Sequence, residues 1–356
     1  MILLDIKNLT LEIDISAGWV KALDKINMVI HEGQIHALVG ESGSGKSLII
    51  KAIVGALPQR WRITADRMTW RGQNLLTMSA KARRKLIRKD ISVIFQSPLE
   101  SLDPSLTMGQ QLKEMLPSNK LTKTWFWQRN EEKQILAIKL LHKVGIKNHH
   151  LCLSSYPHQI ANDVVQKFMV AMALASEPRL IIADDPTKGM EVTSKTQILK
   201  LLSRVNQVKS MSVLFVSHDL LAISSMASYM TVLYCGQTVE SGDLKQLRKR
   251  AFHPYTQALL DSAPSFRKDL PPKSPLNSLD GTIPTLHHLP IGCRLGPRCP
   301  RARRECVTWL LSTSDAADEQ LCVGVRWRRN NTLNTKTSDL SVAKVSLANV
   351  VSAELI

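Results

Sequence analysis

The residues best suited to chemistry lie in a glycine-rich stretch that ends in a lysine and a serine. Residues 40–47 read Gly-Glu-Ser-Gly-Ser-Gly-Lys-Ser and fit the pattern G-x-x-x-x-G-K-[ST]. This pattern binds phosphate when a strand precedes it and a helix follows it. Residues 34–39 before it are apolar and β-favouring, and residues 47–54 after it are helix-like and close at Gly55. The sequence therefore predicts a nucleotide phosphate site.

This loop supplies three kinds of group to a phosphate. Its glycines let backbone N–H groups converge on an anion at the positive end of the helix dipole. Lys46 reaches the β- and γ-phosphates, and the Ser47 hydroxyl is a ligand for Mg²⁺. The residues that we expect to bind the nucleotide are Gly40, Glu41, Ser42, Gly43, Ser44, Gly45, Lys46 and Ser47.

Two carboxylates and a histidine follow apolar segments later in the chain. Residues 180–185 form a strand-like run that ends in Asp184 and Asp185. Mg²⁺-assisted phosphoryl transfer needs a carboxylate at such a position, so we expect Asp184 to bind Mg²⁺ and Asp185 to orient the attacking water. His218 follows the apolar run of residues 212–216 and is placed to contact a γ-phosphate.

The elements that position these residues begin with strands. Residues 2–13 and 20–30 alternate apolar and polar side chains, as half-buried strands do, and predict an antiparallel β layer before the loop. Trp19 is suited to stacking on an adenine, and equally to packing as a strand aromatic. Another strand, residues 91–96, ends in the polar residue Gln96.

Helical spacing marks four later segments, which are residues 109–116, 131–144, 164–176 and 193–208. Gly145 is a plausible C-terminal cap for the second of them. The aromatic group at residues 125–127 reads Trp-Phe-Trp. It marks a contact site if it is exposed and a core if it is buried.

Composition limits the class of protein. The net charge is +17. No apolar run approaches the length of about 18 residues that a membrane-spanning helix needs. The first residues carry an early acid and no basic region, so we expect no signal peptide and a cytosolic or peripheral protein. Basic clusters occur at residues 81–89, 298–304 and 326–329. They are either solvated faces or contacts for an anionic partner. Because the first two lack interleaved aromatics, they favour a membrane surface over nucleic acid.

Four cysteines gather towards the end of the sequence. Cys293, Cys299, Cys306 and Cys322 are separated by five, six and fifteen residues. Their surroundings are rich in proline and arginine, which favours a metal or cluster site in a segment with little core. The spacing does not distinguish zinc from iron–sulfur, and a metal-free segment stays an alternative. Residues 264–284 are rich in proline, lysine and serine and predict a linker before this segment.

The order of these motifs resembles that of ABC transporter ATP-binding subunits. In that resemblance residues 40–47 are the Walker A loop, Asp184 and Asp185 the Walker B acids, and His218 the switch histidine. Gln96 becomes the Q-loop glutamine, which implies a Mg²⁺-binding and catalytic role. The implied ligands are ATP and Mg²⁺. The implied fold is an α/β P-loop NTPase domain with a mixed sheet and an antiparallel β layer, a helical subdomain and a small C-terminal cysteine-containing domain.

The later part of the chain resembles the oligopeptide/dipeptide branch of that family, through residues 232–240, 253–259 and 289–300. In this branch the C-terminal cysteines ligate a [4Fe–4S] cluster. The chain to about residue 328 most resembles Sap-type subunits, which are linked to antimicrobial-peptide resistance in Gram-negative bacteria. The implied parts are an ATP-binding core of residues 1–96 and 177–246, a helical subdomain of residues 97–176, a C-terminal domain of residues 247–328 and a mobile tail of residues 329–356.

Three departures from the family pattern affect chemistry. The signature loop L-S-G-G-x-x-Q is expected at residues 160–166, which read Ile-Ala-Asn-Asp-Val-Val-Gln. Ala161 lacks the hydroxyl, and Asp163 would repel the γ-phosphate that this loop contacts on the opposite subunit. Asp185 replaces the usual glutamate and is one methylene shorter, and a misplacement of about 1 Å can cost roughly 10²-fold in rate. Residues 188–191 replace the usual x-A-L-D with Lys-Gly-Met-Glu.

These departures predict a peptide-transporter subunit that hydrolyses ATP slowly in a heterodimer. Each composite site pairs one subunit's Walker A loop with the other's signature loop. In a homodimer, both sites would combine Asp185 with the altered signature loop. In a heterodimer whose partner has the family's usual residues, each site would contain only one of these two departures. Further expected partners are two membrane permease subunits and a periplasmic peptide-binding protein, with this chain at the cytoplasmic face of the inner membrane.

Two alternatives belong to other classes. One is a regulatory subunit that binds ATP without meaningful hydrolysis, which the altered signature loop favours. The other is a soluble ABC-type nucleic-acid ATPase, which the net charge and the cysteine cluster suggest. The peptide-branch C-terminal region argues against the second, so we expect no nucleic-acid partner.

Overall fold

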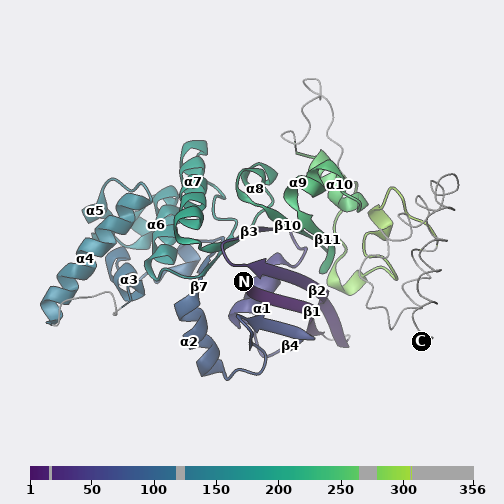
Figure 1. The fold of residues 1–356 in the computed structure, drawn as a ribbon, viewed down its shortest axis with the longest axis horizontal. Helices are drawn as coiled ribbons and strands as arrows, with labels where there is room; N and C mark the ends of the chain where they lie inside the picture. Colours follow the sequence, from purple (N-terminus) through teal and green to yellow (C-terminus); the bar gives the residue numbers. More distant parts are fainter. Residues whose placement is uncertain (16–17, 118–124, 264–278, 305, 307–356) are drawn as a thin grey trace, which may run out of the picture.

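Figure 1 shows the chain, a computed structural model, with two sheets near its centre and helices on both sides of them. The structure describes residues 1–15, 18–117, 125–263, 279–304 and 306. Most of the linker predicted at residues 264–284, Cys322 and the predicted tail at residues 329–356 lie outside the described residues.

Six strands form the central sheet. In spatial order they are β11 (Gln237–Asp243), β10 (Tyr229–Tyr234), β3 (Ile35–Val39), β9 (Ser212–Val216), β8 (Leu180–Asp184) and β7 (Ile91–Ile94). β11 runs antiparallel to β10, and the other neighbouring pairs are parallel. Every residue of β3, β8 and β9 is buried. Their continuous apolar runs fit this position, because both faces of a parallel sheet are covered.

A second, antiparallel sheet confirms the predicted β layer. Its strands are β1 (Ile2–Ile15), β2 (Gly18–His31), β4 (Trp61–Thr64), β5 (Arg67–Trp70) and β6 (Gln73–Asn74). β1 pairs with β2 along one edge and with β4 and β5 along the other. Leu4, Ile6, Leu9 and Leu11 of β1 are buried in a core shared with α1 (Lys46–Val54) and the central sheet.

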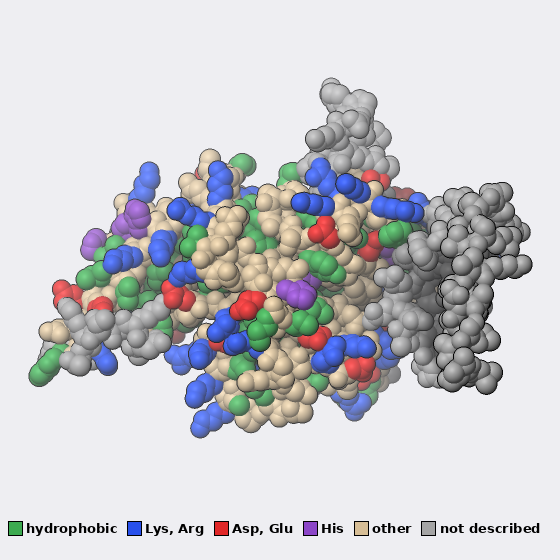
Figure 2. All heavy atoms as spheres, viewed as in Figure 1, with side chains coloured by type: hydrophobic (Ala, Val, Ile, Leu, Met, Phe, Trp, Pro, Cys, Tyr) green, Lys and Arg blue, Asp and Glu red, His purple; other side chains and the backbone are tan. Residues whose placement is uncertain are grey.

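Glycines bound α1, as the sequence predicts. Gly45 precedes the helix with φ of 104°, and Gly55 ends it with φ of 74°. The basic segment that follows the second sheet forms another helix, α2 (Ala80–Asp90), which begins where the Ser79 hydroxyl accepts from the N–H of Ala82. Figure 2 shows a group of Lys and Arg side chains at the position of α2, so most of this basic cluster faces solvent.

The remaining helices form two groups in Figure 1, and both groups pack in the core on the face of the central sheet opposite α1. One group contains α3 (Met108–Met115), α4 (Phe126–Lys143), α5 (His149–Ser154) and α6 (Asn162–Ala175). The other contains α7 (Val192–Lys209), α8 (Leu220–Met226), α9 (Leu244–Lys249) and α10 (Pro254–Asp261). Short 3₁₀ turns lie at Leu99–Ser101, Pro157–Gln159, Leu286–His288 and Gly296–Arg298.

Two predicted boundaries were wrong. The strand expected at residues 91–96 stops at Ile94, and Gln96 lies in the exposed loop that follows. The helix expected at residues 131–144 begins earlier, at Phe126, and Trp125 is its cap residue. Trp125 is 66% exposed, which excludes a core role for this aromatic. Within the described residues, no helix has both the length and the apolar character needed to cross a membrane.

Candidate functional site

Three neighbouring strands end at one edge of the central sheet and bring the predicted residues together. Gly40 follows β3, and Asp184 is the last residue of β8. β9 lies between them, because its last residue, Val216, pairs with Leu38 on one side and with Asp184 on the other. Ligands of open α/β sheets bind at this carboxyl edge.

Glycine is required at two positions of the loop. A Cβ on Gly40 would lie 2.2 Å from the carbonyl oxygen of Leu233, and a Cβ on Gly45 would lie 2.6 Å from Leu23 Cδ2. Gly43 and Gly45 also have positive φ values of 84° and 104°. The absence of side chains therefore allows the loop to fold closely against β10 and β2.

Lys46 lies across the loop. Its Nζ donates to the carbonyl oxygens of Gly40 at 2.7 Å and Glu41 at 2.8 Å. Burial lowers the pKa of Lys46, and the carboxylates of Asp185, Asp184 and Glu41 act in the opposite direction. The ammonium group is thus placed among carboxylates at the point where a phosphate chain would enter.

Ser47 and Asp184 form the pair expected for Mg²⁺. Ser47 Oγ donates to Asp184 Oδ2 over 3.2 Å. Burial raises the pKa of Asp184, whereas the hydrogen bond from Ser47 lowers it. One hydroxyl and one carboxylate are hard oxygen ligands, and Mg²⁺ commonly takes its remaining ligands from water and phosphate. The two residues therefore fit the ion. Gln96 lies two residues beyond β7, the strand adjacent to β8.

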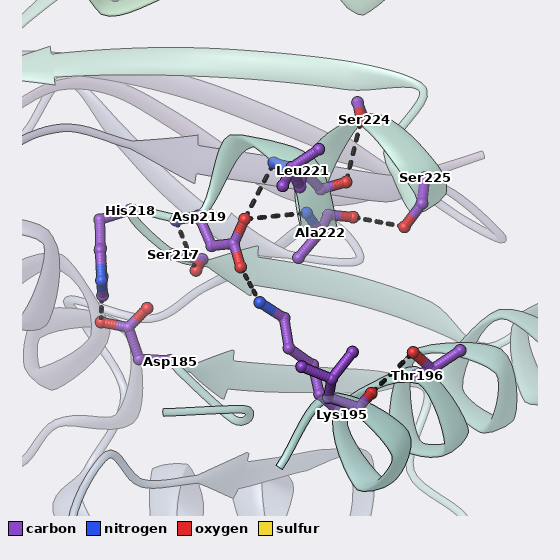
Figure 3. Close-up of polar contacts among 11 residues, drawn as sticks. Asp185, Lys195, Thr196, Ser217, His218, Asp219, Leu221, Ala222, Ser224 and Ser225 are labelled. Carbon is purple, nitrogen blue, oxygen red and sulfur yellow. Dashed lines mark hydrogen bonds and ion pairs between the residues drawn. The ribbon is translucent and has the colours of Figure 1, made fainter. Parts of the chain in front are cut away.

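Asp185 and His218 point towards each other, as Figure 3 shows. Asp185 Oδ2 lies 3.2 Å from His218 Nδ1. The Asp185 backbone has φ of 44°, and its N–H donates to Val216 O over 2.8 Å. Aspartate tolerates this left-handed conformation better than most residues. The chain turns sharply after β8 and directs the carboxylate to the histidine on the neighbouring strand end.

A second ion pair fixes the segment that carries His218. Lys195 Nζ on α7 contacts Asp219 Oδ2 (Figure 3). Asp219 Oδ1 also accepts from the N–H groups of Leu221 and Ala222 and so caps α8. The position of His218 therefore depends on α7, the helix that follows residues 188–191.

The altered signature loop, residues 160–166, makes side-chain contacts with neighbouring segments. Ala161 precedes α6 and offers no side-chain cap. Asp163 Oδ2 lies 3.1 Å from Lys167 Nζ and accepts from Ser194 Oγ at 3.1 Å. The side chain of Gln166 donates to the carbonyl of Pro186 over 2.6 Å. The start of α6 is thus tied to α7 and to the turn after β8.

Trp19 lies at the start of β2 and is 46% exposed. The guanidinium carbon of Arg62 lies 4.5 Å from its ring centroid, a cation–π contact on one face. Stacking of Trp19 on an adenine stays a prediction.

The structure describes three of the four clustered cysteines. Burial raises the pKa of the Cys299 thiol, and the neighbouring Cys293 and Cys306 add to that increase. Among the described residues, however, no group of three or more His, Cys, Asp or Glu side chains is arranged to hold a metal ion. The metal site stays a prediction.

Sequence reasoning missed several residues that hold the site. Lys167 had a local signal, because it follows Asp163 by four residues on one helix face. Ser194 and Lys195 had none, because their contacts join segments far apart in the chain.

Comparison with known proteins identifies the family. Residues 23–188 match the family described as ABC transporter, and residues 239–306 match the oligopeptide/dipeptide transporter C-terminal region. The chain is 51% identical over 307 residues to the peptide transport system ATP-binding protein SapD of Salmonella typhimurium, which covers 86% of this chain and 93% of that protein. The chain belongs to the ABC transporter ATP-binding family.

Two further comparisons agree. The dipeptide transport ATP-binding protein DppD of Haemophilus influenzae is 39% identical over 306 residues, with 86% of this chain and 90% of that protein covered. A solved dimeric bacterial ABC transporter cassette has a TM-score of 0.60 at 23% identity and covers 68% of this chain and 99% of that chain. The latter confirms the ABC ATPase fold. Membership of the ABC family also makes ATP and Mg²⁺ the ligands of the site.

Proposed function

We propose that the chain is the ATP-binding subunit of a peptide ABC transporter and lies at the cytoplasmic face of the inner membrane. Its partners are two permease subunits and a periplasmic peptide-binding protein. The peptide and dipeptide systems named for its relatives and its oligopeptide-type C-terminal region support this proposal. The Sap-type resemblance suggests antimicrobial peptides as the specific cargo.

The proposed roles follow from the residues at the carboxyl edge of the central sheet. Lys46 binds the β- and γ-phosphates, and Ser47 and Asp184 hold Mg²⁺ together with Gln96. Asp185 orients the attacking water, and His218 contacts the γ-phosphate. The observation that carries this assignment is the pair of short contacts, Ser47 to Asp184 and Asp185 to His218, at neighbouring strand ends.

We also propose that the subunit acts in a heterodimer with slow, asymmetric turnover. Asp163 places a carboxylate at the start of α6, where the family has a glycine that approaches the opposite γ-phosphate. Its pairing with Lys167 reduces the charge but leaves side chains where the phosphate would approach. The test is steady-state ATP hydrolysis by the purified chain alone and with its partner subunit. Brisk turnover by the isolated chain would contradict the proposal.

A non-hydrolytic regulatory role is the second candidate, and the same Asp163 contacts favour it. The two candidates differ at the site that pairs Asp185 with the partner's intact signature loop. A heterodimer in which the partner's catalytic glutamate is replaced by glutamine isolates that site. Residual hydrolysis that disappears in Asp185→Asn supports the transport ATPase, and its absence supports the regulatory subunit.

The third proposal concerns a [4Fe–4S] cluster held by Cys293, Cys299, Cys306 and Cys322, with zinc as the alternative. The spacing of the four cysteines in a segment rich in proline and arginine supports this proposal. Anaerobically purified chain should show a broad brown absorbance that Cys293→Ser removes. Stoichiometric zinc without colour would refute the cluster.

A DNA-binding assay at physiological salt tests the alternative that the chain is a nucleic-acid ATPase.

A further inference from the structure

Glu41, the second residue of the Walker A loop, contacts two residues from the C-terminal third of the chain. Arg298 Nη1 lies 3.1 Å and 3.3 Å from the two carboxylate oxygens of Glu41. The backbone N–H of Glu41 donates to Tyr255 Oη over 2.9 Å. These partners are 257 and 214 residues from Glu41 in sequence. The Walker A loop is therefore held by residues outside the ATP-binding core.

The protein itself fixes the position of Arg298. Its side chain is 8% exposed. Its Nε donates to the carbonyl of Asp280 over 2.8 Å, and its Nη2 donates to the carbonyl of Leu279 over 3.2 Å. Because the guanidinium group is a rigid planar fork, these bonds also determine the direction of Nη1. Arg298 thus presents a fixed positive charge to Glu41.

The charge of Glu41 matters because of its neighbours. The backbone carbonyl of Glu41 accepts from Lys46 Nζ at 2.8 Å, so the residue that carries this carboxylate adjoins the ammonium group. A bound triphosphate needs the same ammonium group, and an uncompensated carboxylate beside it would repel the phosphates. Glu41 therefore competes with ATP unless another cation pairs with it.

We propose that Arg298 makes the Walker A loop able to accept ATP by neutralising Glu41, so that the C-terminal segment is part of the nucleotide site. Arg298 positions Glu41 and compensates its charge, and it need not touch ATP. The inference concerns ATP binding by this chain alone. Its failure would leave the proposed heterodimer and transport function unaffected.

The experiment compares Mg²⁺–ATP affinity, measured by isothermal titration calorimetry, in four full-length variants. Arg298→Gln retains a side-chain donor and removes the charge, so we expect binding on the order of tenfold weaker. Glu41→Gln removes the competing carboxylate, so its affinity should equal or exceed that of the unaltered chain. The double variant should recover affinity to within about threefold, since both charges are gone. Arg303→Ala alters a nearby exposed arginine and is the matched control.

A purely structural role for the contact gives a different pattern. Glu41→Gln would then weaken binding as much as Arg298→Gln, and the double variant would show no recovery. Either result overturns the proposal, as does unchanged affinity in Arg298→Gln. The charge effect has a further signature, because the deficit of Arg298→Gln should shrink as salt is raised. Thermal unfolding followed by circular dichroism checks that each variant is folded. If Arg298→Gln does not fold, the Glu41→Gln affinity still decides between the two roles.

Discussion

Replacing Asp163 with alanine tests whether an internal ion pair holds the altered signature loop. Asp163 is 31% exposed and Lys167 is 11% exposed, so their pair lies between a surface pair and a buried one. Breaking a buried pair costs about 3–5 kcal/mol, and an exposed pair contributes about 0–1 kcal/mol. The hydrogen bond from Ser194 adds about 1 kcal/mol, and an acid in the first turn of a helix adds about 0.3–1 kcal/mol. We expect Asp163→Ala to lose about 3 kcal/mol of unfolding free energy.

The assay is thermal unfolding followed by circular dichroism. A loss of this size corresponds to a decrease in Tm of about 5–10 °C for a domain of this size class. Lys167→Met keeps the apolar stem of Lys167 and removes its charge. In the variant Asp163→Ala with Lys167→Met, the total loss should be smaller than the sum of the single losses by about 1–2 kcal/mol. Glu131→Ala, an exposed acid on α4, is the control and should change Tm little. Additive losses, or an unchanged Tm in Asp163→Ala, would refute the reasoning.

Three other predictions concern ATP and pH. Lys46→Ala should abolish ATP binding in equilibrium dialysis, because it removes the ammonium group of the Walker A loop, and retained affinity would refute its assignment. Asp185→Glu should raise phosphate release by the heterodimer at least several-fold if side-chain reach limits the rate, and an unchanged rate would locate the defect at residues 161–163. Burial lowers the pKa of His253 from 6.5 to about 4. Between these two pH values the unfolded chain binds more protons than the folded chain, so the free energy of unfolding should fall as pH is lowered. The expected loss at pH 5 is about 2 kcal/mol. His253→Asn keeps a helix cap without the titration, and its Tm should depend less on pH; an equal pH dependence would contradict this cause.

Local patterns predict the part of the fold that surrounds the Walker A loop. β3, the glycine loop and α1 are adjacent in sequence, and their strand, turn and helix signals are all local. The apolar runs that form β8 and β9 are also recognisable, because strands buried on both faces need continuous apolar residues. These runs are sufficient to place Asp184, Asp185 and His218 at or just beyond strand ends.

The remaining features depend on contacts that no local pattern encodes. α2 is strongly basic with few apolar residues, so its sequence gives no clear helical pattern. The strand predicted at residues 91–96 ends at Ile94, and the next residue, Phe95, is exposed although it is apolar. The Walker A motif predicts Glu41 as a nucleotide-binding residue and gives no partner for its carboxylate. Its ion pair with Arg298 joins residues 257 positions apart, and sequence spacing carries no information about such a contact.

The contacts of Glu41 also have a consequence during synthesis. A ribosome that adds about 5–20 residues per second takes about 10–50 s to move from Glu41 to Arg298, which is 257 residues later. Throughout that interval the nascent chain has its Walker A loop without the arginine that compensates Glu41. The proposed role of Arg298 then implies that a nascent chain binds ATP poorly until Arg298 has been synthesised. Prematurely terminated products would therefore compete little with finished subunits in ATP-dependent assembly with a partner.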